Sequence, residues 1–218
     1  MVAASQIPEA VIRRLPLYAR VLRVLEARQD TVSSRELGDW LGRRPAQVRK
    51  DLSYFGRFGK QGRGYNVERL LAELRDILGL TRTWNMALVG VGRLGRAIVD
   101  YRGFATEGFE VVACFDASPE RVGKKAGKLL VQPMAEMAQT FKEKSIHIGL
   151  VAVPANQAQQ VIDQLVAAGA RGILNYAPMA PKVPLAVLVR YVDPVRYLQS
   201  MTFHLKNEKG FGHKASLD

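Results

Sequence analysis

Cysteine is almost absent from the chain, since Cys114 is the single one among 218 residues. It therefore has no partner for an intrachain disulfide, and the apolar run around it favours a buried structural thiol. Long apolar runs are absent too, because none approaches the roughly 18 residues that span a bilayer. The first residues do not resemble a signal peptide, because Arg13, Arg14, Arg20 and Arg23 interrupt their apolar positions. These absences predict a cytoplasmic protein with no membrane partner.

Histidine is also scarce, with three in the chain. His147 begins a predicted strand, His204 lies on a predicted terminal helix, and His213 lies in the tail. None clearly follows a strand, where the proton-transferring group of many α/β enzymes lies. We expect no catalytic residue, and we also expect no bound metal.

Positive charge is in excess. The 32 Lys and Arg residues outnumber the 20 Asp and Glu, for a formal net charge of +12. Such an excess attracts polyanions, of which nucleic acid and anionic membranes are the usual ones. Residues 1–83 hold sixteen of the basic and nine of the acidic residues, so the charge is denser there. The alternative is a protein that is cationic without a specific partner.

The hydrophobic period changes near residues 82–85, from a helical pattern to short β-branched runs that alternate with helices. This change predicts one domain over residues 1–83 and a second over residues 84–193. A terminal helix over 194–205 and a disordered tail over 206–218 are expected to follow.

The first part predicts a helix-turn-helix unit. Because proline is favoured in the first turn of a helix, we expect one helix to end near Arg14 and another to begin at Pro16. Ser33 and Glu36 fit a capping box for the next helix, which Gly42 ends. A further helix is predicted over residues 45–55. The inward face of the capped helix is predicted to hold Leu37, Trp40 and Leu41.

A glycine-rich segment over residues 56–65 follows the third helix and suits a tight β-hairpin. A basic helix beside a narrow basic hairpin is typical of a winged helix that reads DNA, although a solvated charged face is the alternative. Asp51 breaks the basic pattern, and we expect it to pair with a neighbouring arginine and to orient it. The candidate DNA contacts are Arg44, Gln47, Arg49, Lys50, Ser53 and Tyr54 on the helix and Lys60, Arg63 and Tyr65 on the hairpin.

The second part predicts a Rossmann-type, doubly wound parallel sheet in an α/β domain. Strands are expected over 86–89, 111–115, 146–153, 172–174 and 188–192, with helices over 94–100, 133–144 and 155–168. Alternation of this kind places helices on both faces of the sheet.

The segment from Gly90 to Gly95 matches the pattern G-x-G-x-x-G between a strand and a helix. The first glycine permits the tight turn, Gly92 lets the backbone approach a pyrophosphate, and Gly95 allows close packing of helix and strand. The helix N-terminus then offers free N–H groups to the phosphates, within reach of Arg93 and beside Leu94.

Asp116 ends the second strand and could accept hydrogen bonds from both hydroxyls of an adenosine ribose, which favours NAD(H) over a 2′-phosphorylated cofactor. The alternative is that Asp116 caps the following turn. The ends of two later strands, at Val153 with Pro154 and at Tyr176, are expected to border the nicotinamide half, or simply to end their strands.

With these motifs in place, the chain resembles the Rex family of redox-sensing transcriptional repressors over residues 10–205. The run from Arg49 to Ser53 is the most specific part of the likeness. The matching segments are residues 14–18, 47–56, 62–65, 90–95 and 172–178.

The resemblance implies a homodimer in which the helix over 194–205 is swapped between subunits. It also implies that Arg20 pairs with Asp193 of the other subunit as a switch, and that Tyr101 lies near the nicotinamide. After this aspartate we expect a bulky apolar residue that enters the nicotinamide pocket. This chain has Pro194 there, and Val195 is the alternative candidate for that role.

The resemblance further implies a repressor that binds a palindromic operator at low NADH and releases it when NADH binds. NADH and NAD⁺ are then effectors and not catalytic cofactors. Two alternatives stay open: a repressor on the same scaffold that senses coenzyme A or another metabolite, and an NAD-dependent dehydrogenase. The second lacks a substrate domain, because the first 83 residues form a basic helical module.

Overall fold

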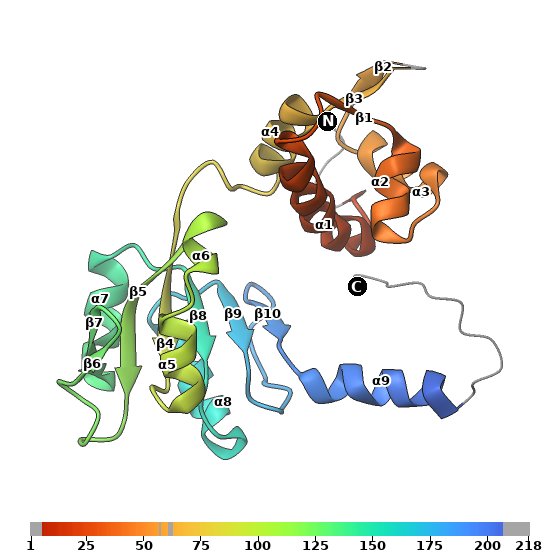
Figure 1. The fold of residues 1–218 in the computed structure, drawn as a ribbon. Coiled ribbons are helices and arrows are strands. Elements are labelled where there is room, and N and C mark those ends of the chain that lie inside the picture. Colours follow the sequence, from red (N-terminus) through yellow and green to blue (C-terminus); the bar gives the residue numbers. More distant parts are fainter. Residues whose placement is uncertain (1–5, 57, 61–62, 207–218) are drawn as a thin grey trace. The chain divides into compact units, whose positions relative to one another are not determined.

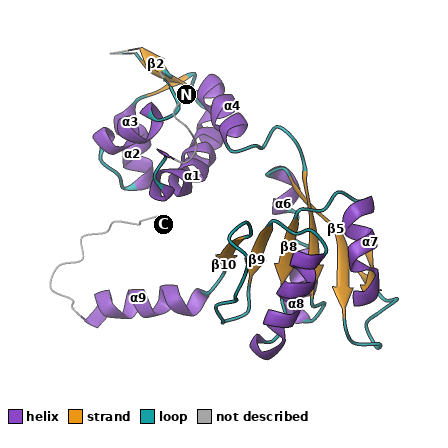
Figure 2. Cartoon of the chain, turned by 180° about the vertical axis from the view of Figure 1, so that it is seen from behind, coloured by secondary structure: helices purple, strands orange, loops and turns teal. Residues whose placement is uncertain are grey.

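The structure is a computed structural model that describes residues 6–56, 58–60 and 63–206. The chain divides into two compact units between Thr81 and Arg82, and each is described by itself (Figures 1 and 2). Within the described ranges, no helix is both long and apolar enough to cross a membrane. The predicted tail lies outside these ranges, apart from Lys206.

The first unit has the order of a winged helix. Its antiparallel sheet has the strand order β1-β3-β2, and β2 and β3 form the predicted hairpin. The predicted winged helix-turn-helix is therefore confirmed, and β1 is an addition that the sequence pattern did not reveal. The elements are α1 (Glu9–Glu26), β1 (Thr31–Val32), α2 (Ser34–Leu41), α3 (Pro45–Ser53), β2 (Gly59–Lys60), β3 (Gly64–Asn66) and α4 (Val67–Ile77).

Helix α1 runs without a break through Pro16, so the predicted division into two helices is wrong. A proline inside a helix lacks one N–H donor and usually bends or breaks it. Here Leu15, Tyr18 and Leu22 lie on both sides of the proline and are buried in the core of the unit. Their burial holds the helix together, and Pro16 itself is exposed.

The turn between α2 and α3 follows the prediction closely. The Ser33 hydroxyl accepts a hydrogen bond from the Glu36 N–H at 3.1 Å, and Gly42 ends α2 in the left-handed conformation at φ 62°. Trp40 departs from the prediction because its side chain is 45% exposed. The inward face of the short α2 consists of Leu37, Gly38 and Leu41.

The second unit is a seven-stranded sheet with the order β10-β9-β8-β4-β5-β7-β6, parallel except for the β6–β7 pair. The chain adds strands outward from β4 on one side and then returns to β8 on the other, as in a Rossmann fold, which confirms the predicted class. The first elements are β4 (Trp84–Val89), α5 (Arg93–Val99), α6 (Gly103–Thr106), β5 (Phe109–Asp116), β6 (Lys125–Ala126) and β7 (Leu129–Pro133). The later ones are η2 (Met134–Glu136), α7 (Met137–Glu143), β8 (Ile148–Val151), α8 (Ala155–Ala167), β9 (Gly172–Asn175), β10 (Leu188–Tyr191) and α9 (Pro194–Lys206).

Alternate residues of β4 serve two cores. Ala87 and Val89 pack with α7 and α8 on one face, whereas Met86 and Leu88 pack with α5 on the other. Cys114 belongs to the α5 side, where burial raises the pKa of its thiol to about 11. The thiol therefore stays protonated at neutral pH, as expected of a structural cysteine.

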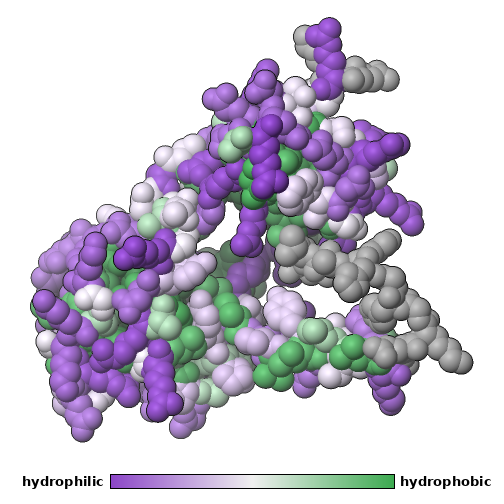
Figure 3. All heavy atoms as spheres, viewed as in Figure 1, coloured by the Kyte–Doolittle hydropathy of each residue, from purple (hydrophilic) through white to green (hydrophobic). Residues whose placement is uncertain are grey.

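Helix α9 is 13 residues long, and none of its residues is buried. Asp193 caps it, since its Oδ1 accepts a hydrogen bond from the Val195 N–H at 3.0 Å. Pro194 is the first residue of α9, where the missing N–H of a proline costs no hydrogen bond within the helix. Figure 3 shows apolar residues along its surface. The large exposed apolar side chains of α9 are Val195, Tyr197, Leu198, Met201, Phe203 and Leu205.

Candidate functional site

The glycine turn connects β4 to α5 at the carboxyl edge of the sheet, between the two halves of the strand order. Gly90 has φ 94°, and a Cβ there would lie 2.5 Å from the Ala152 carbonyl oxygen and 2.7 Å from Val153 Cγ1. Only glycine fits, because both the backbone conformation and the close approach of β8 exclude a side chain. The turn is thereby held against the end of β8.

The other two glycines of the motif have opposite surroundings. A Cβ on Gly95 would collide with the Gly90 carbonyl oxygen and lie 3.3 Å from Leu88 Cδ2, so this glycine allows helix and strand to pack. A Cβ on Gly92 would meet no atom within 4 Å. The space beside Gly92, at the N-terminus of α5, is therefore open to a ligand.

Arg93 and Leu94 begin α5, and both are exposed at this edge. Because the first N–H groups of a helix have no partner within it, this end offers hydrogen-bond donors and a positive dipole end to an anion. The geometry suits the pyrophosphate predicted from the motif.

Asp116 at the end of β5 is buried, and its carboxylate already has partners within the unit. The backbone N–H groups of Val91 and Ser118 donate to its two oxygens at 2.7 and 2.8 Å, and Arg121 Nη1 donates to Oδ2 at 3.1 Å. Burial alone would raise the pKa of Asp116, but these hydrogen bonds and the charge of Arg121 lower it below its ordinary value. Asp116 thus both ties the glycine turn to β5 and caps the next turn, as the alternative prediction stated.

The carboxyl ends of β8 and β9 border the same edge. The Ala152 N–H donates to the Val89 carbonyl at 2.9 Å, and the Tyr176 N–H donates to the Val151 carbonyl at 2.9 Å. Val153 is half-buried, and Pro154 is exposed at the start of α8.

Asn175 is a residue of this edge whose part the sequence reasoning missed. It is 1% exposed, and its amide donates to the carbonyls of Ala177 and Met179, both at 3.1 Å, while it accepts from the Ala177 N–H. These bonds shape the loop that follows β9 and presents Tyr176. Tyr176 is half-buried, and burial raises the pKa of its hydroxyl. An asparagine just before a proline-containing loop is the one signal in the sequence that could have indicated this turn.

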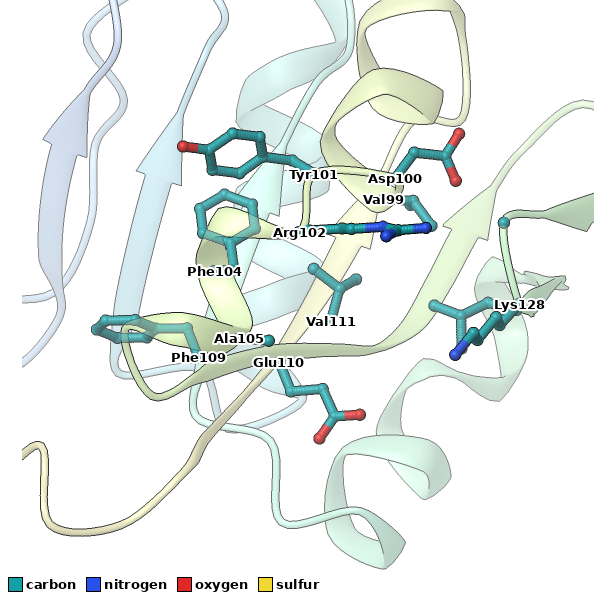
Figure 4. Close-up of a pocket in the computed structure, with 12 residues that line it drawn as sticks. Val99, Asp100, Tyr101, Arg102, Phe104, Ala105, Phe109, Glu110, Val111 and Lys128 are labelled. Atoms are coloured by element: carbon teal, nitrogen blue, oxygen red, sulfur yellow. The ribbon is translucent and has the colours of Figure 1, made fainter.

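Tyr101 does not join the glycine turn of its own chain. It lies beyond the C-terminal end of α5, and the seven residues of this helix separate it from the turn by roughly 10 Å. There Tyr101 packs edge-on against Phe104 at the mouth of a cavity of about 800 Å³ (Figure 4). The other residues that line this cavity come from the ends of α5, α6, β5 and the β6–β7 turn, and none belongs to the glycine motif.

The candidate DNA interface is the outer side of α3. Arg44, Arg49 and Lys50 are exposed there, and Arg49 also donates to the Ser34 hydroxyl at 3.0 Å. Ser53 is exposed and its hydroxyl donates to the Lys50 carbonyl, whereas Tyr54 is half-buried.

The three predicted contacts of the hairpin have different surroundings. Arg63 is exposed, but the side chain of Lys60 lies outside the described part of the structure. Tyr65 packs against the core of the unit, and burial raises the pKa of its hydroxyl. The ring of Tyr65 therefore has a structural role that its place in a basic hairpin did not indicate.

Asp51 pairs with an arginine as predicted, but the arginine comes from another helix. Arg14 of α1 donates to the Asp51 carboxylate through Nε at 2.6 Å and through Nη2 at 2.8 Å. Tyr18 and Gln47 complete the cluster at 2.6 and 2.7 Å. The sequence reasoning missed Arg14 and Tyr18 because tertiary packing alone brings α1 against α3.

The switch residues of the resemblance lie in different units. Arg20 is exposed on α1, and Asp193 caps α9. Within the described ranges, no group of three or more His, Cys, Asp or Glu side chains is placed to hold a metal ion.

Known families match both parts of the chain. Residues 81–179 match the family described as "CoA binding domain", and residues 6–53 match the one described as "Putative DNA-binding protein N-terminus". The structure of RSP with β-NAD⁺ and operator DNA aligns with a TM-score of 0.88 at 38% identity, covering 93% of this chain and 94% of that one. The structure of RSP with β-NADH aligns at 0.84 and 36%, covering 94% and 96%.

Curated relatives match over nearly their whole lengths. The redox-sensing transcriptional repressor Rex of Chloroflexus aurantiacus is 56% identical over 93% of this chain and 96% of its own. The Rex of Carboxydothermus hydrogenoformans is 46% identical over 93% and 98%. Since the identity is this high and extends through both the winged helix and the sheet, the chain belongs to the Rex family of redox-sensing transcriptional repressors.

Proposed function

We propose that the protein is a cytoplasmic transcriptional repressor that binds operator DNA and is released from it by NADH. The observation that carries this proposal is the open space beside Gly92, at the crossover edge of a Rossmann sheet, in a chain whose other unit exposes a basic α3. The ligand is an effector, and the protein is not an enzyme.

The glycine turn is the proposed effector site. The pyrophosphate would lie over Gly92 and the N-terminus of α5 with Arg93 and Leu94 beside it, and the adenosine ribose would approach Asp116. To accept a ribose hydroxyl, Asp116 would use the one of its about four acceptor positions that the three present donors leave, or would exchange Arg121 for the hydroxyl. Val153, Pro154 and Tyr176 would border the nicotinamide. Tyr101 is not part of this site within one chain.

Redox sensing requires the site to distinguish the oxidised nicotinamide ring from the reduced one. NAD⁺ carries a positive charge on a planar nicotinamide, and NADH carries none. A half-buried pocket bordered by Val153 and Tyr176, close to Arg93, would disfavour the cation.

DNA binding is proposed for α3 and the hairpin. Arg44 and Gln47 would reach the major groove, with the other members of the predicted set on α3 contacting bases or phosphates. Arg63 and Lys60 at the hairpin would follow the minor groove. The ring of Tyr65 packs against the core and supports the hairpin, and its hydroxyl would contact phosphate.

The apolar side chains of α9 support a homodimer. A helix with six large apolar side chains exposed is stable in water only when a partner covers them. We propose that α9 packs on the other subunit, where Asp193 would meet Arg20. Two copies of α3 then read an inverted repeat whose half-sites lie about one helical turn apart, or a multiple of it.

NADH would act by favouring an arrangement of the dimer in which the distance between the two copies of α3 does not match the distance between the two half-sites. A ligand shifts such an equilibrium only by its different affinity for the two states. Moving the dimer from almost fully bound to almost fully released requires about 5 kcal/mol, shared between two sites.

Fluorescence anisotropy tests this proposal. The protein first selects an inverted repeat from randomised duplex DNA, and its affinity for that duplex is then measured with NADH and with NAD⁺. We expect tight binding without nucleotide, release by NADH and a much weaker response to NAD⁺. Equal responses to the two nucleotides would contradict redox sensing, and indifference to every duplex would contradict repression.

A second candidate effector is coenzyme A, which the match of residues 81–179 to a CoA-binding family favours. Its diphosphate could also lie on the glycine turn. Calorimetry with NADH, NAD⁺, NADP⁺ and coenzyme A separates the two, since the proposal requires NADH to bind most tightly.

A further inference from the structure

The Asp51 cluster joins two helices of the first unit through one carboxylate. Asp51 is fully buried on α3, and four hydrogen bonds reach its two oxygens. Oδ2 accepts from Arg14 Nε and Tyr18 Oη, and Oδ1 accepts from Arg14 Nη2 and Gln47 Nε2. A carboxylate offers about four acceptor positions, so this one is fully used.

The contact with Asp51 fixes the orientation of the Gln47 amide. An ionised carboxylate only accepts hydrogen bonds, so the Gln47 amide must face it with its nitrogen. The reverse orientation would place the amide oxygen against a negative charge. The contact therefore leaves the oxygen of Gln47 as the acceptor that is free for another donor.

Gln47 also lies in the middle of the candidate DNA interface. Residues three apart on a helix share a face, so Gln47 and Lys50 form a row along α3, and Arg44 precedes this row as the N-cap of the helix. Arg44 and Lys50 are exposed, while Gln47 is half-buried and tied to Asp51. A fixed amide thus stands between two basic side chains.

We propose that Asp51 is a positioning residue for base reading: it holds the amide nitrogen of Gln47, so that the amide oxygen faces the operator. Through Arg14 and Tyr18 the same carboxylate sets α3 against α1. This inference rests on the proposed function, because it specifies how the DNA-reading helix is presented.

A purely structural role would not need Gln47. Arg14 and Tyr18 already supply three of the four hydrogen bonds, and both residues come from α1. Gln47 is on the same helix as Asp51, so its contact adds nothing to the joining of the two helices. What it does is hold one side chain of the exposed row in a single orientation.

The test measures base preference, and stability serves only as a control. The probes are the inverted-repeat duplex selected by the wild-type protein and a duplex of scrambled sequence, and the readout is the ratio of the two affinities by anisotropy. We expect D51N to lower this ratio about tenfold or more, the range of a lost base contact. Thermal unfolding establishes that the variant is folded.

A double-mutant cycle separates positioning from independent effects. Q47M should lower the ratio as much as D51N, and the two changes together should lower it no further, because each breaks the same contact. The pair D51N with Q47E exchanges amide and carboxylate and keeps an acceptor oxygen on the outside, so it should recover part of the preference. D163N is the matched control, since Gln159 donates to Asp163 at 2.8 Å in the same i,i+4 arrangement on the exposed side of α8. It should leave the ratio unchanged.

The outcomes are distinct. If D51N weakens both duplexes by the same factor, or if its effect adds to that of Q47M, the inference is overturned. If D51N does not fold, Q47E alone tests the contact, because its carboxylate cannot donate to Asp51 and the ratio should fall. An unchanged ratio in Q47E overturns the inference as well. A wild-type protein with no preference for any duplex would instead contradict the proposed function.

Discussion

The Val91 N–H donates a hydrogen bond to the Asp116 carboxylate at 2.7 Å, which ties the glycine turn after β4 to the end of β5. Both elements that would hold the adenosine half of a dinucleotide are thus joined before any ligand binds. A site joined in this way loses less entropy when it binds its ligand.

Replacing Asp116 by alanine should weaken NADH binding at least tenfold, because the turn loses its tie and the ribose loses its acceptor. Tenfold corresponds to about 1.4 kcal/mol. Calorimetry with NADH measures the change. Arg121→Ala serves as the control, since its ion pair is 47% exposed on the arginine side and is worth little. An unchanged NADH affinity in Asp116→Ala would remove Asp116 from the site.

Two glycines of the turn should respond in opposite ways to alanine. Gly92→Ala should fold normally, because its φ is −76° and a Cβ there meets nothing, yet the methyl group would block the pyrophosphate. The variant should bind operator and ignore NADH, as anisotropy can measure. Gly90→Ala should lower the melting temperature, because its φ is 94° and a Cβ would crowd Ala152 and Val153. If NADH still released Gly92→Ala from the operator, the phosphates of NADH would not bind beside Gly92.

Lys50 is exposed on α3 and is expected to contact phosphate. Each neutralised phosphate adds about 0.9 to the slope of log affinity against log salt on duplex DNA. Lys50→Ala should therefore weaken operator and scrambled duplex alike and reduce the slope by about one. Anisotropy between low and moderate salt measures the slope. Lys142→Ala, on α7 of the other unit, is the control, and an equal loss there would show that only net charge matters.

The stability of the first unit should depend on pH, because the Asp51 carboxyl has different pKa values in the folded and unfolded protein. Burial alone would raise the pKa of this carboxyl, but hydrogen bonds from Arg14, Tyr18 and Gln47 lower it below its ordinary value of 3.8. A group with a lowered pKa stabilises the fold above its unfolded pKa, and this contribution disappears as the pH falls through the folded value.

At neutral pH, D51N should destabilise the protein by about 3 kcal/mol, as expected when one partner of a largely buried pair is removed. The difference in melting temperature between wild type and D51N should stay constant from neutral pH to about pH 5 and shrink below about pH 4. Circular dichroism at several pH values measures it. A difference that does not change with pH would mean that Asp51 is not ionised in the folded protein.

Pro16 interrupts the hydrogen bonds of α1 without ending the helix. Pro16→Ala should raise the free energy of unfolding by about 1–2 kcal/mol, because alanine is roughly 3 kcal/mol better inside a helix and part of that gain is offset by the freer unfolded chain. Urea unfolding measures the change. Pro45→Ala, at the first position of α3 where proline costs nothing, should show no such gain.

The glycine pattern shows how much of this protein could be predicted from sequence. G-x-G-x-x-G between an apolar strand and a helix placed the turn, because Gly90 and Gly95 answer local steric needs that no other residue meets. The capping of α2 by Ser33 and its end at Gly42 were predictable for the same reason. The parallel sheet with helices on both faces followed from the alternation of strands and helices, since parallel strands require helical crossovers.

What the sequence could not reveal depends on contacts between distant residues. Whether Pro16 ends a helix was decided by the core on both of its sides. The exposure of Trp40 and the packing of Tyr65 against the core also depended on tertiary contacts. Two of the three partners of Asp51, Arg14 and Tyr18, come from α1, up to thirty-seven residues away. Those of Asp116 come in part from the glycine turn twenty-five residues before it. Local patterns report the conformational preferences of neighbours in the chain, whereas a buried carboxylate is satisfied by whichever donors the folded core brings to it.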